Sequence, residues 1–408
     1  MAKNTPTIRF AGYTDAWEQR KLPEFVSFYN GLTYTPDDVR ETGTLVLRSS
    51  NVKNGAVVDA DNVYVDPNKA NSENVKDGDI VVVVRNGSRA LIGKHAEVKG
   101  AMPNTVIGAF MTGIRSEYPS FVNALLDTPQ FDKEIEKNMG ATINQITGYM
   151  FSKMEFFIPS SHEEKRQIGA LFKSLDDTIT LHQRKYDELQ QIKKYMLQKM
   201  FPKGSETKPE IRFAGFTDAW EQRKLSEVLE IVNNKNGNSY GKEDVLSVSD
   251  EYGCINQIRF QGRSFAGEDI SNYKIVETGD IVYTRSPLKS KPYGIIKVVG
   301  AETGIVSPLY IVNKAKPGND SEFIYRVFDS PEKTNTYLSP LVRKGAKNTM
   351  NISNDEWLSG EIIVASSFDE QKKIGEYFKN LDNLITLHQR KLEQLKNVKK
   401  ALLQNMFI

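Results

Sequence analysis

Two polar segments follow matching apolar runs, and their side chains are of the kinds that contact base edges in DNA. In the first half of the chain, Gly78-Asp79-Ile80 and four valines are followed by Arg85, Asn86, Ser88, Arg89 and Lys94. In the second half, Gly279-Asp280-Ile281 precedes Arg285, Ser286, Lys289 and Lys291. Arginine and lysine donate to guanine, and asparagine pairs with adenine, in the major groove. The pattern favours DNA contact over ordinary exposed turns, and Arg85 and Arg285 are the strongest individual candidates.

A second pair of candidate segments precedes the last expected strand of each half. The first half has Asn144 and Gln145 there, and the second half has Lys347 and Asn348. Glycine-alanine turns that only close a domain are the alternative at these positions. The amide-rich segments 48–54 and 233–236 are weaker candidates, because asparagine is common in turns for conformational reasons alone.

Catalytic chemistry has little support in the sequence. Cys254 is the single cysteine and the four histidines are scattered, so neither a disulfide framework nor a metal-ligand pattern is present. The sequence contains no NPPY or DPPY tetrapeptide, no Walker A loop and no GxGxxG motif. We therefore expect no catalytic residues, no metal and no cofactor in this chain.

Bulk charge adds a constraint on how DNA could be bound. The formal net charge is only +2, with 54 basic and 52 acidic residues. This balance argues against a protein that coats nucleic acid through overall charge alone, and any contact with DNA must be local. Other subunits could supply further positive surface.

The elements that position these segments occur twice. Residues 6–22 read PTIRFAGYTDAWEQRKL and residues 209–225 read PEIRFAGFTDAWEQRKL, so only two positions differ. Residues 160–201 and 366–407 form a second repeat around ITLHQRK. Between these constant frames lie two divergent stretches with a faint common template, as expected if the two stretches recognise different things.

The second repeat predicts two long amphipathic helices. Ile168, Leu175, His182, Leu189 and Met196 are spaced seven apart, and the register recurs from Ile374 to Leu402. About forty residues would span about 60 Å as a helix. The lysine pairs at 193–194 and 399–400 are interpreted as solvated helix faces, with docking to partner subunits as the alternative.

The predicted fold class is mixed α+β, with two pseudo-symmetric α/β domains separated by two long antiparallel coiled-coil helices. Short β-type runs alternate with Gly, Asn, Pro and Asp turn signals in each divergent stretch. The expected segments are a domain at 1–159, a helix at 160–201, a linker at 202–208, a domain at 209–365 and a helix at 366–408. No apolar run approaches the length of a membrane span, and a cytoplasmic protein is expected.

The ordered, duplicated set resembles the specificity subunit of a type I restriction–modification system. The features that carry the resemblance are the repeated IRFAG(Y/F)TDAWEQRKL motif, the GDIV strand and the IG..F..LD..IT.HQRK helix, which together cover essentially the whole chain. The resemblance implies that each divergent stretch is a target recognition domain for one half of a bipartite, asymmetric DNA site, and that the paired helices set the spacing.

The same resemblance implies the partners and where the chemistry lies. Double-stranded DNA, two copies of a methyltransferase subunit and motor–nuclease restriction subunits are expected. S-adenosylmethionine would belong to the methyltransferase, and ATP and Mg²⁺ to the restriction subunit. The alternative is a coiled-coil adaptor that does not read sequence, which would account for the helices but not for the divergent domains.

Overall fold

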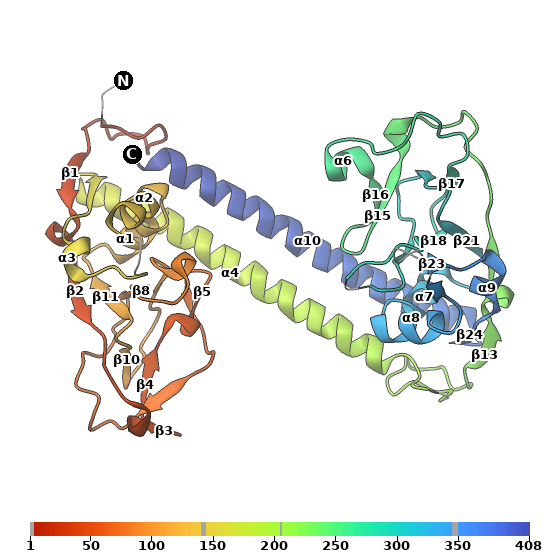
Figure 1. Ribbon diagram of the computed structural model, residues 1–408, viewed down its shortest axis with the longest axis horizontal. Coiled ribbons are helices and arrows are strands. Elements are labelled where there is room, and N and C mark those ends of the chain that lie inside the picture. Colours follow the sequence, from red (N-terminus) through yellow and green to blue (C-terminus); the bar gives the residue numbers. More distant parts are fainter. Residues whose placement is uncertain (1–3, 140–143, 205, 290, 345–349) are drawn as a thin grey trace. The chain divides into compact units, whose positions relative to one another are not determined.

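The chain folds as two compact units, Met1–Gln183 with Arg390–Ile408 and Arg184–Gln389. A computed structural model describes residues 4–139, 144–204, 206–289, 291–344 and 350–408 (Figure 1). Each unit contains one of the two expected α/β domains, for which we keep the name recognition domain that the resemblance implies, and about half of each long helix. The segment boundaries expected from the repeats stay predictions, because the units divide within the helices rather than at the ends of the repeats.

The recognition domain of the first unit is built on two sheets. Six strands are ordered β2-β11-β8-β9-β6-β5 and four are ordered β10-β4-β7-β3. Helices α1 (Pro119–Leu126) and α2 (Pro129–Asn138) follow the sheets, and α3 (Gly148–Phe151) follows α2. The strands are β2 (Ser27–Asn30), β3 (Val39–Arg40), β4 (Thr44–Leu47), β5 (Val52–Lys53), β6 (Ala56–Val57), β7 (Val63–Val65), β8 (Ile80–Val83), β9 (His95–Glu97), β10 (Thr105–Ile107) and β11 (Met111–Arg115).

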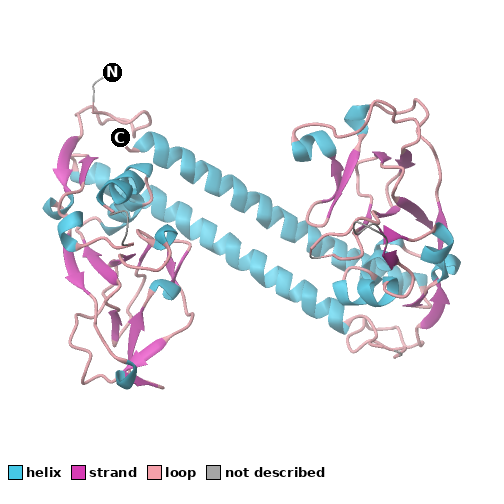
Figure 2. Ribbon diagram, in the orientation of Figure 1, coloured by secondary structure: helices cyan, strands magenta, loops and turns pink. Residues whose placement is uncertain are grey.

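The second unit repeats the centre of this arrangement. Its four-stranded sheet is ordered β14-β21-β18-β19, which corresponds to β2-β11-β8-β9. Figure 2 shows that both units combine strands with short helices. The strands are β14 (Leu229–Ile231), β15 (Leu246–Ser249), β16 (Gly253–Asn256), β17 (Lys274–Val276), β18 (Ile281–Tyr283), β19 (Ile296–Val298), β20 (Gly304–Val306), β21 (Ile311–Ala315), β22 (Arg343–Lys344) and β23 (Met350–Asn351). The helices are α5 (Leu225–Val228), α6 (Gln257–Gln261), α7 (Ser321–Val327), α8 (Pro331–Leu338) and α9 (Asn354–Ser359).

The repeated Gly-Asp pair makes the turn that starts the central strand. Gly78 and Gly279 have φ values of 82° and 93°, which residues with a Cβ rarely adopt. The buried Asp79 carboxylate accepts the Lys76 N–H at 2.9 Å, and Asp280 accepts the Glu277 N–H at 2.8 Å. The motif therefore fixes where each central strand begins, and with it the loop that follows.

The long helices are α4 (His162–Lys199, 38 residues) and α10 (Phe368–Met406, 39 residues). In the first unit, Phe172 packs on Phe407, and Asp176 of α4 is paired with Lys399 of α10. Increasing residue numbers on one helix thus match decreasing numbers on the other. The same antiparallel order holds in the second unit, where Lys193 pairs with Asp382 and Phe201 packs on Phe378.

The repeated amino-terminal motif docks on a helix end in each unit. In the first unit the Ile8 N–H donates to the Asn405 oxygen at 2.9 Å, and Trp17 packs edge-on against Phe407. In the second unit Ile211 donates to Lys199 at 2.9 Å and Trp220 packs on Phe201. The motif ends in a strand that closes a two-stranded sheet, β1 (Glu18–Lys21) with β12 (Glu155–Ile158) or β13 (Glu221–Lys224) with β24 (Glu361–Val364).

The glycine of the repeated Ile-Gly pair allows a close approach between helices. A Cβ added at Gly169 would lie 2.7 Å from the Phe121 nitrogen of α1. At Gly375 it would lie 3.0 Å from the Phe323 nitrogen of α7. A side chain at either position would force the recognition domain away from its long helix.

The predicted fold class is confirmed, with mixed helices and strands in both units and two long antiparallel helices. The central strands end within one residue of the apolar runs that predicted them. Within the part of the chain that the structure describes, no helix combines the length and the apolar character needed to cross a membrane.

Candidate nucleic-acid interface

Two of the predicted segments meet on one surface of the first unit. Arg85 forms a single antiparallel bridge with Gln145. The Asn86 N–H donates to the Asn144 oxygen at 3.3 Å, and Asn144 Nδ2 donates to the Gly87 oxygen at 3.1 Å. The loop after β8 and the segment before α3 were predicted separately, and the structure joins them.

Arg85 is exposed on this surface and lies over an aromatic ring. Its guanidinium carbon is 5.0 Å from the centre of the Phe110 ring, a favourable cation–π geometry. The Phe110 oxygen accepts the N–H groups of Val84 and Arg85 at 2.9 and 3.2 Å. Phe110 was not predicted from the sequence. The available signal was an aromatic residue in a short turn between two strands.

The remaining candidates of this loop divide into turn formers and exposed side chains. Asn86 Oδ1 accepts the Ser88 N–H at 2.9 Å and Asn86 Nδ2 donates to Ser49 Oγ at 3.2 Å, so this amide shapes the loop. Ser88 and Arg89 are exposed, and Lys94 is half-buried. Residues 84–94 contain three basic side chains and no acidic one.

The second unit uses its arginine differently. Counted from the Gly-Asp-Ile motif, Arg285 corresponds to Val84, one residue before Arg85. It has a φ of 52°, and its Nη1 donates to the Ile352 oxygen at 3.0 Å. Its Nε donates to the Leu309 oxygen at 2.7 Å. Burial lowers the pKa of Arg285. The two arginines predicted as a pair therefore lie in different environments.

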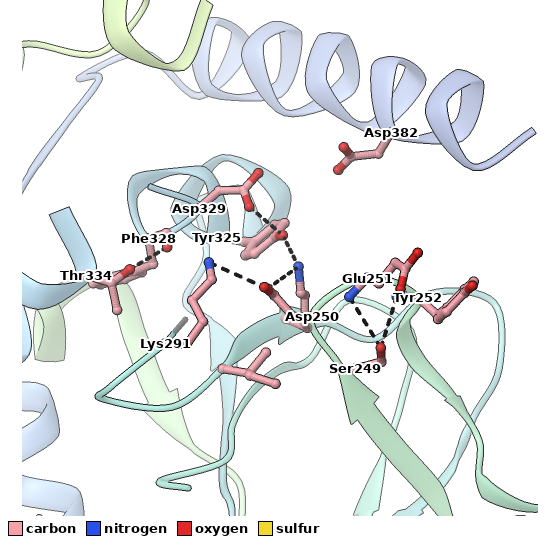
Figure 3. A network of polar contacts seen from close by, with 12 residues as sticks. Ser249, Asp250, Glu251, Tyr252, Lys291, Tyr325, Phe328, Asp329, Thr334 and Asp382 are labelled. Atoms are coloured by element: carbon pink, nitrogen blue, oxygen red, sulfur yellow. Dashed lines mark hydrogen bonds and ion pairs between the residues drawn. The ribbon is translucent and has the colours of Figure 1, made fainter. Parts of the chain in front are cut away.

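Other candidates of the second unit are also separated by the fold. Ser286 and Lys289 are exposed on the loop after β18. Lys291 turns inward and forms an ion pair with Asp250 at 3.5 Å (Figure 3). Lys347 and Asn348 lie outside the described residues. Asn236 of the weaker candidate segment is buried, and its amide donates to the oxygens of Tyr240 and Ile270.

A lysine of each long helix ties a recognition domain to the helix pair. Lys399 Nζ lies 2.7 Å from Asp127, which follows α1, and 2.5 Å from Asp176 of α4. Burial opposes the charged lysine, but the two carboxylates outweigh it and raise the pKa of Lys399. We call Lys399 with these two aspartates the first brace. The interpretation of this lysine as a solvated helix face is wrong.

The second unit has the matching brace. Lys193 Nζ lies 2.8 Å from Asp329, which follows α7, and 2.7 Å from Asp382 of α10. Figure 3 shows Asp329 bonded to Tyr325 in the polar network that includes the Asp250–Lys291 pair, and Asp382 on α10 without a drawn contact. Burial alone would lower the pKa of Lys193, but the two carboxylates outweigh burial and raise this pKa. Both domains are thus held to the helices by a Lys-Asp-Asp group.

His95 of β9 makes the first brace sensitive to pH. Its Nδ1 lies 2.9 Å from the Gly93 oxygen, and its Nε2 lies 3.4 Å from Asp127 Oδ1. Burial favours the neutral ring, but the nearby Asp127 carboxylate outweighs burial and raises the pKa of His95. Lys399 and Asp132 are the other charged groups that act on this ring.

We expect the first unit to lose stability as pH rises. Because the folded pKa of His95 lies above the unfolded value, its contribution is fully present below about pH 6.5 and is lost as pH rises through the folded pKa. Hydrogen exchange, corrected for its intrinsic pH dependence, should show this loss in the first unit. His95→Gln should remove that part of the pH dependence, and an unchanged pH profile in the variant would contradict this assignment.

Comparisons with known proteins agree with the geometry. The family model described as the type I restriction modification DNA specificity domain matches the chain twice, at residues 14–191 and 217–397. The specificity subunit of the type I restriction enzyme EcoKI from Escherichia coli K12 is 20% identical, and the alignment covers 96% of this chain and 89% of that one.

An archaeal relative and a solved structure extend the likeness. The MjaVIII specificity subunit of Methanocaldococcus jannaschii is 24% identical over 65% of this chain, and the match spans 64% of that relative's length. The crystal structure of a type I restriction–modification S subunit from M. genitalium superimposes with a TM-score of 0.69 at 13% identity, covering 99% of both chains, which shows a shared fold.

Because the family model covers both recognition domains and most of both long helices, the chain belongs to the family of type I restriction–modification DNA specificity subunits.

Proposed function

We propose that this chain reads a bipartite DNA site, with one half-site for each unit. The observation that carries the proposal is a constant frame around two different reading surfaces. Both units have the same docked motif, the same Lys-Asp-Asp brace and the same central strand. The loop after that strand differs, since Arg85 is exposed over Phe110 while the guanidinium of Arg285 is bound to backbone oxygens.

The proposed contacts are of two kinds. Arg85, Ser88 and Lys289 are exposed and would contact base edges, which carry the sequence information. Arg89 and Lys94 add positive charge that suits phosphate contacts, which position the protein without discriminating sequence. Because the net charge is only +2, we expect the chain to bind DNA tightly only as part of a larger complex.

The chain itself would perform no catalysis. We propose that two copies of a methyltransferase subunit, which binds S-adenosylmethionine, join it, and that motor–nuclease subunits using ATP and Mg²⁺ join for restriction. Two identical partners require two similar surfaces, and the repeated helix sequences supply them. The complex would act on DNA in the cytoplasm.

The proposal is tested by mapping methylated adenines. Cells that carry this chain with its methyltransferase partner are compared, by single-molecule sequencing, with cells that lack only this chain. We expect methylation at one split motif only when the chain is present. If the complex assembles but no motif depends on the chain, the sequence-reading function is wrong and an adaptor function replaces it.

A further inference from the structure

Phe110 is a large apolar side chain that the fold does not use. It lies in the turn between β10 and β11 and is 54% exposed. It is absent from the hydrophobic clusters of the first unit. A single exposed phenylalanine needs no explanation in general. Here, however, the ring lies under the guanidinium of Arg85, the strongest candidate base reader of the loop.

The position of the ring is well defined by its surroundings. The Phe110 main-chain oxygen accepts two N–H groups from the loop after β8, and these hydrogen bonds hold the turn and the loop together. Asn144 and Gln145 border the same loop. The loop carries Arg85, Arg89 and Lys94 and no acidic residue, which suits an approach to the phosphate-lined groove of DNA.

We propose that Arg85 and Phe110 act together as a base-reading pair in the major groove. Arg85 would donate to O6 and N7 of a guanine, and the Phe110 ring would contact the 5-methyl group of a neighbouring thymine. The cation–π contact with the ring would restrain the guanidinium before DNA binds, so less conformational freedom is lost on binding. This inference rests on the proposed function and adds specificity-determining Phe110 to it.

The second unit cannot read DNA in the same way. The register of β8 and β18 with β11 and β21 places Leu309 where Phe110 lies in the first unit. Leu309 is 69% exposed, but Arg285 donates to its backbone oxygen instead of lying over an aromatic ring. The guanine-thymine signature therefore belongs to the half-site of the first unit alone, and Leu309→Ala is a matched control.

The test uses base analogues in DNA bound by the assembled complex of this chain with its methyltransferase partner. The half-site of the first unit is the one whose recognition changes when residues 85–89 are replaced. Deoxyuridine in place of thymine removes only the 5-methyl group, and 7-deazaguanine removes only N7. For the wild-type complex we expect the thymine change to weaken binding about three- to fivefold. We expect the guanine change to weaken it about tenfold.

Variants of the two residues should abolish the matching effects. With Phe110→Ala, duplexes containing thymine and deoxyuridine should bind equally, while 7-deazaguanine still weakens binding. With Arg85→Ala, the guanine analogue should lose its effect. Leu309→Ala should leave both effects intact. Unchanged thermal unfolding of Phe110→Ala would exclude a folding defect.

Several outcomes would overturn the inference while leaving the proposed function in place. A first half-site without thymine beside guanine would do so. So would a wild-type complex that is insensitive to deoxyuridine, or a Phe110→Ala complex that keeps the full thymine effect. A wild-type complex with no preference for any split motif would instead contradict the proposed function itself.

Discussion

Replacing Phe407 with alanine is expected to lower the free energy of unfolding of the first unit by about 3–5 kcal/mol. Phe407 is only 4% exposed. Its ring lies 6.0 Å from Trp17, 5.8 Å from Phe121 and 5.8 Å from Phe172. It thereby joins the docked amino-terminal motif, the recognition domain and α4. The cavity left by alanine would loosen all three elements.

The second unit supplies a matched variant. Phe201 is 2% exposed and contacts Trp220, Phe323 and Phe378, the counterparts of the residues around Phe407. Hydrogen exchange read by mass spectrometry reports the two units separately. Phe407→Ala should speed exchange mainly in the first unit, and Phe201→Ala mainly in the second. Equal changes in both units for either variant would contradict the packing described.

Glu370→Ala is expected to destabilise the second unit by about 3 kcal/mol. The Glu370 carboxylate is fully buried and accepts hydrogen bonds from Arg212 Nε at 2.6 Å and Nη2 at 2.7 Å. Without it, a largely buried guanidinium loses its counter-charge. Urea unfolding measures the effect. Glu376→Ala, at an exposed position on the same helix, should change stability by less than about 0.5 kcal/mol.

A double variant separates the charge effect from packing. Replacing both partners, as Arg212→Met with Glu370→Leu, removes the unpaired charge, and such exchanges are often neutral or stabilising. The double variant should therefore recover most of the stability lost in Glu370→Ala. If it is less stable than the single variant, the ion pair matters mainly through its shape and not through its charge.

The fold was predictable because its signals are local and repeated. The seven-residue spacing predicted helices of about forty residues, and α4 and α10 have 38 and 39. The Gly-Asp pairs marked the central strands, since the turn before each strand needs a positive φ and a capping carboxylate. Duplication then extended each local prediction to the second unit.

The braces were missed because their partners are distant in the sequence. Lys399 meets Asp127 across 272 residues, and the aspartate lies within the divergent stretch. On a helix pattern alone, such a lysine cannot be told from the exposed lysines around it. Its burial depends on how close the recognition domain comes, which Gly169 permits through a contact that is not local in the sequence.

The candidate site was predictable in outline and not in detail. Residue types and strand ends placed Arg85 and Asn144 in polar segments, and the structure joins those segments. A shift of one residue after the strand separated Arg285 from its supposed counterpart. The shift places Arg285 at the position of buried Val84, where its guanidinium is bonded to backbone oxygens instead of lying exposed over a ring.

The central claim, that each unit reads one half of a split site, is tested most directly by adenine methylomes of three strains. The first expresses the unmodified chain, the second carries Gly and Ser in place of residues 85–89, and the third carries them in place of residues 286–289. We predict that the second strain alters or loses recognition of one half-site only, and that the third affects only the other. If both replacements affect the same half-site, or if neither changes the methylated motif, the assignment of one half-site to each unit is wrong.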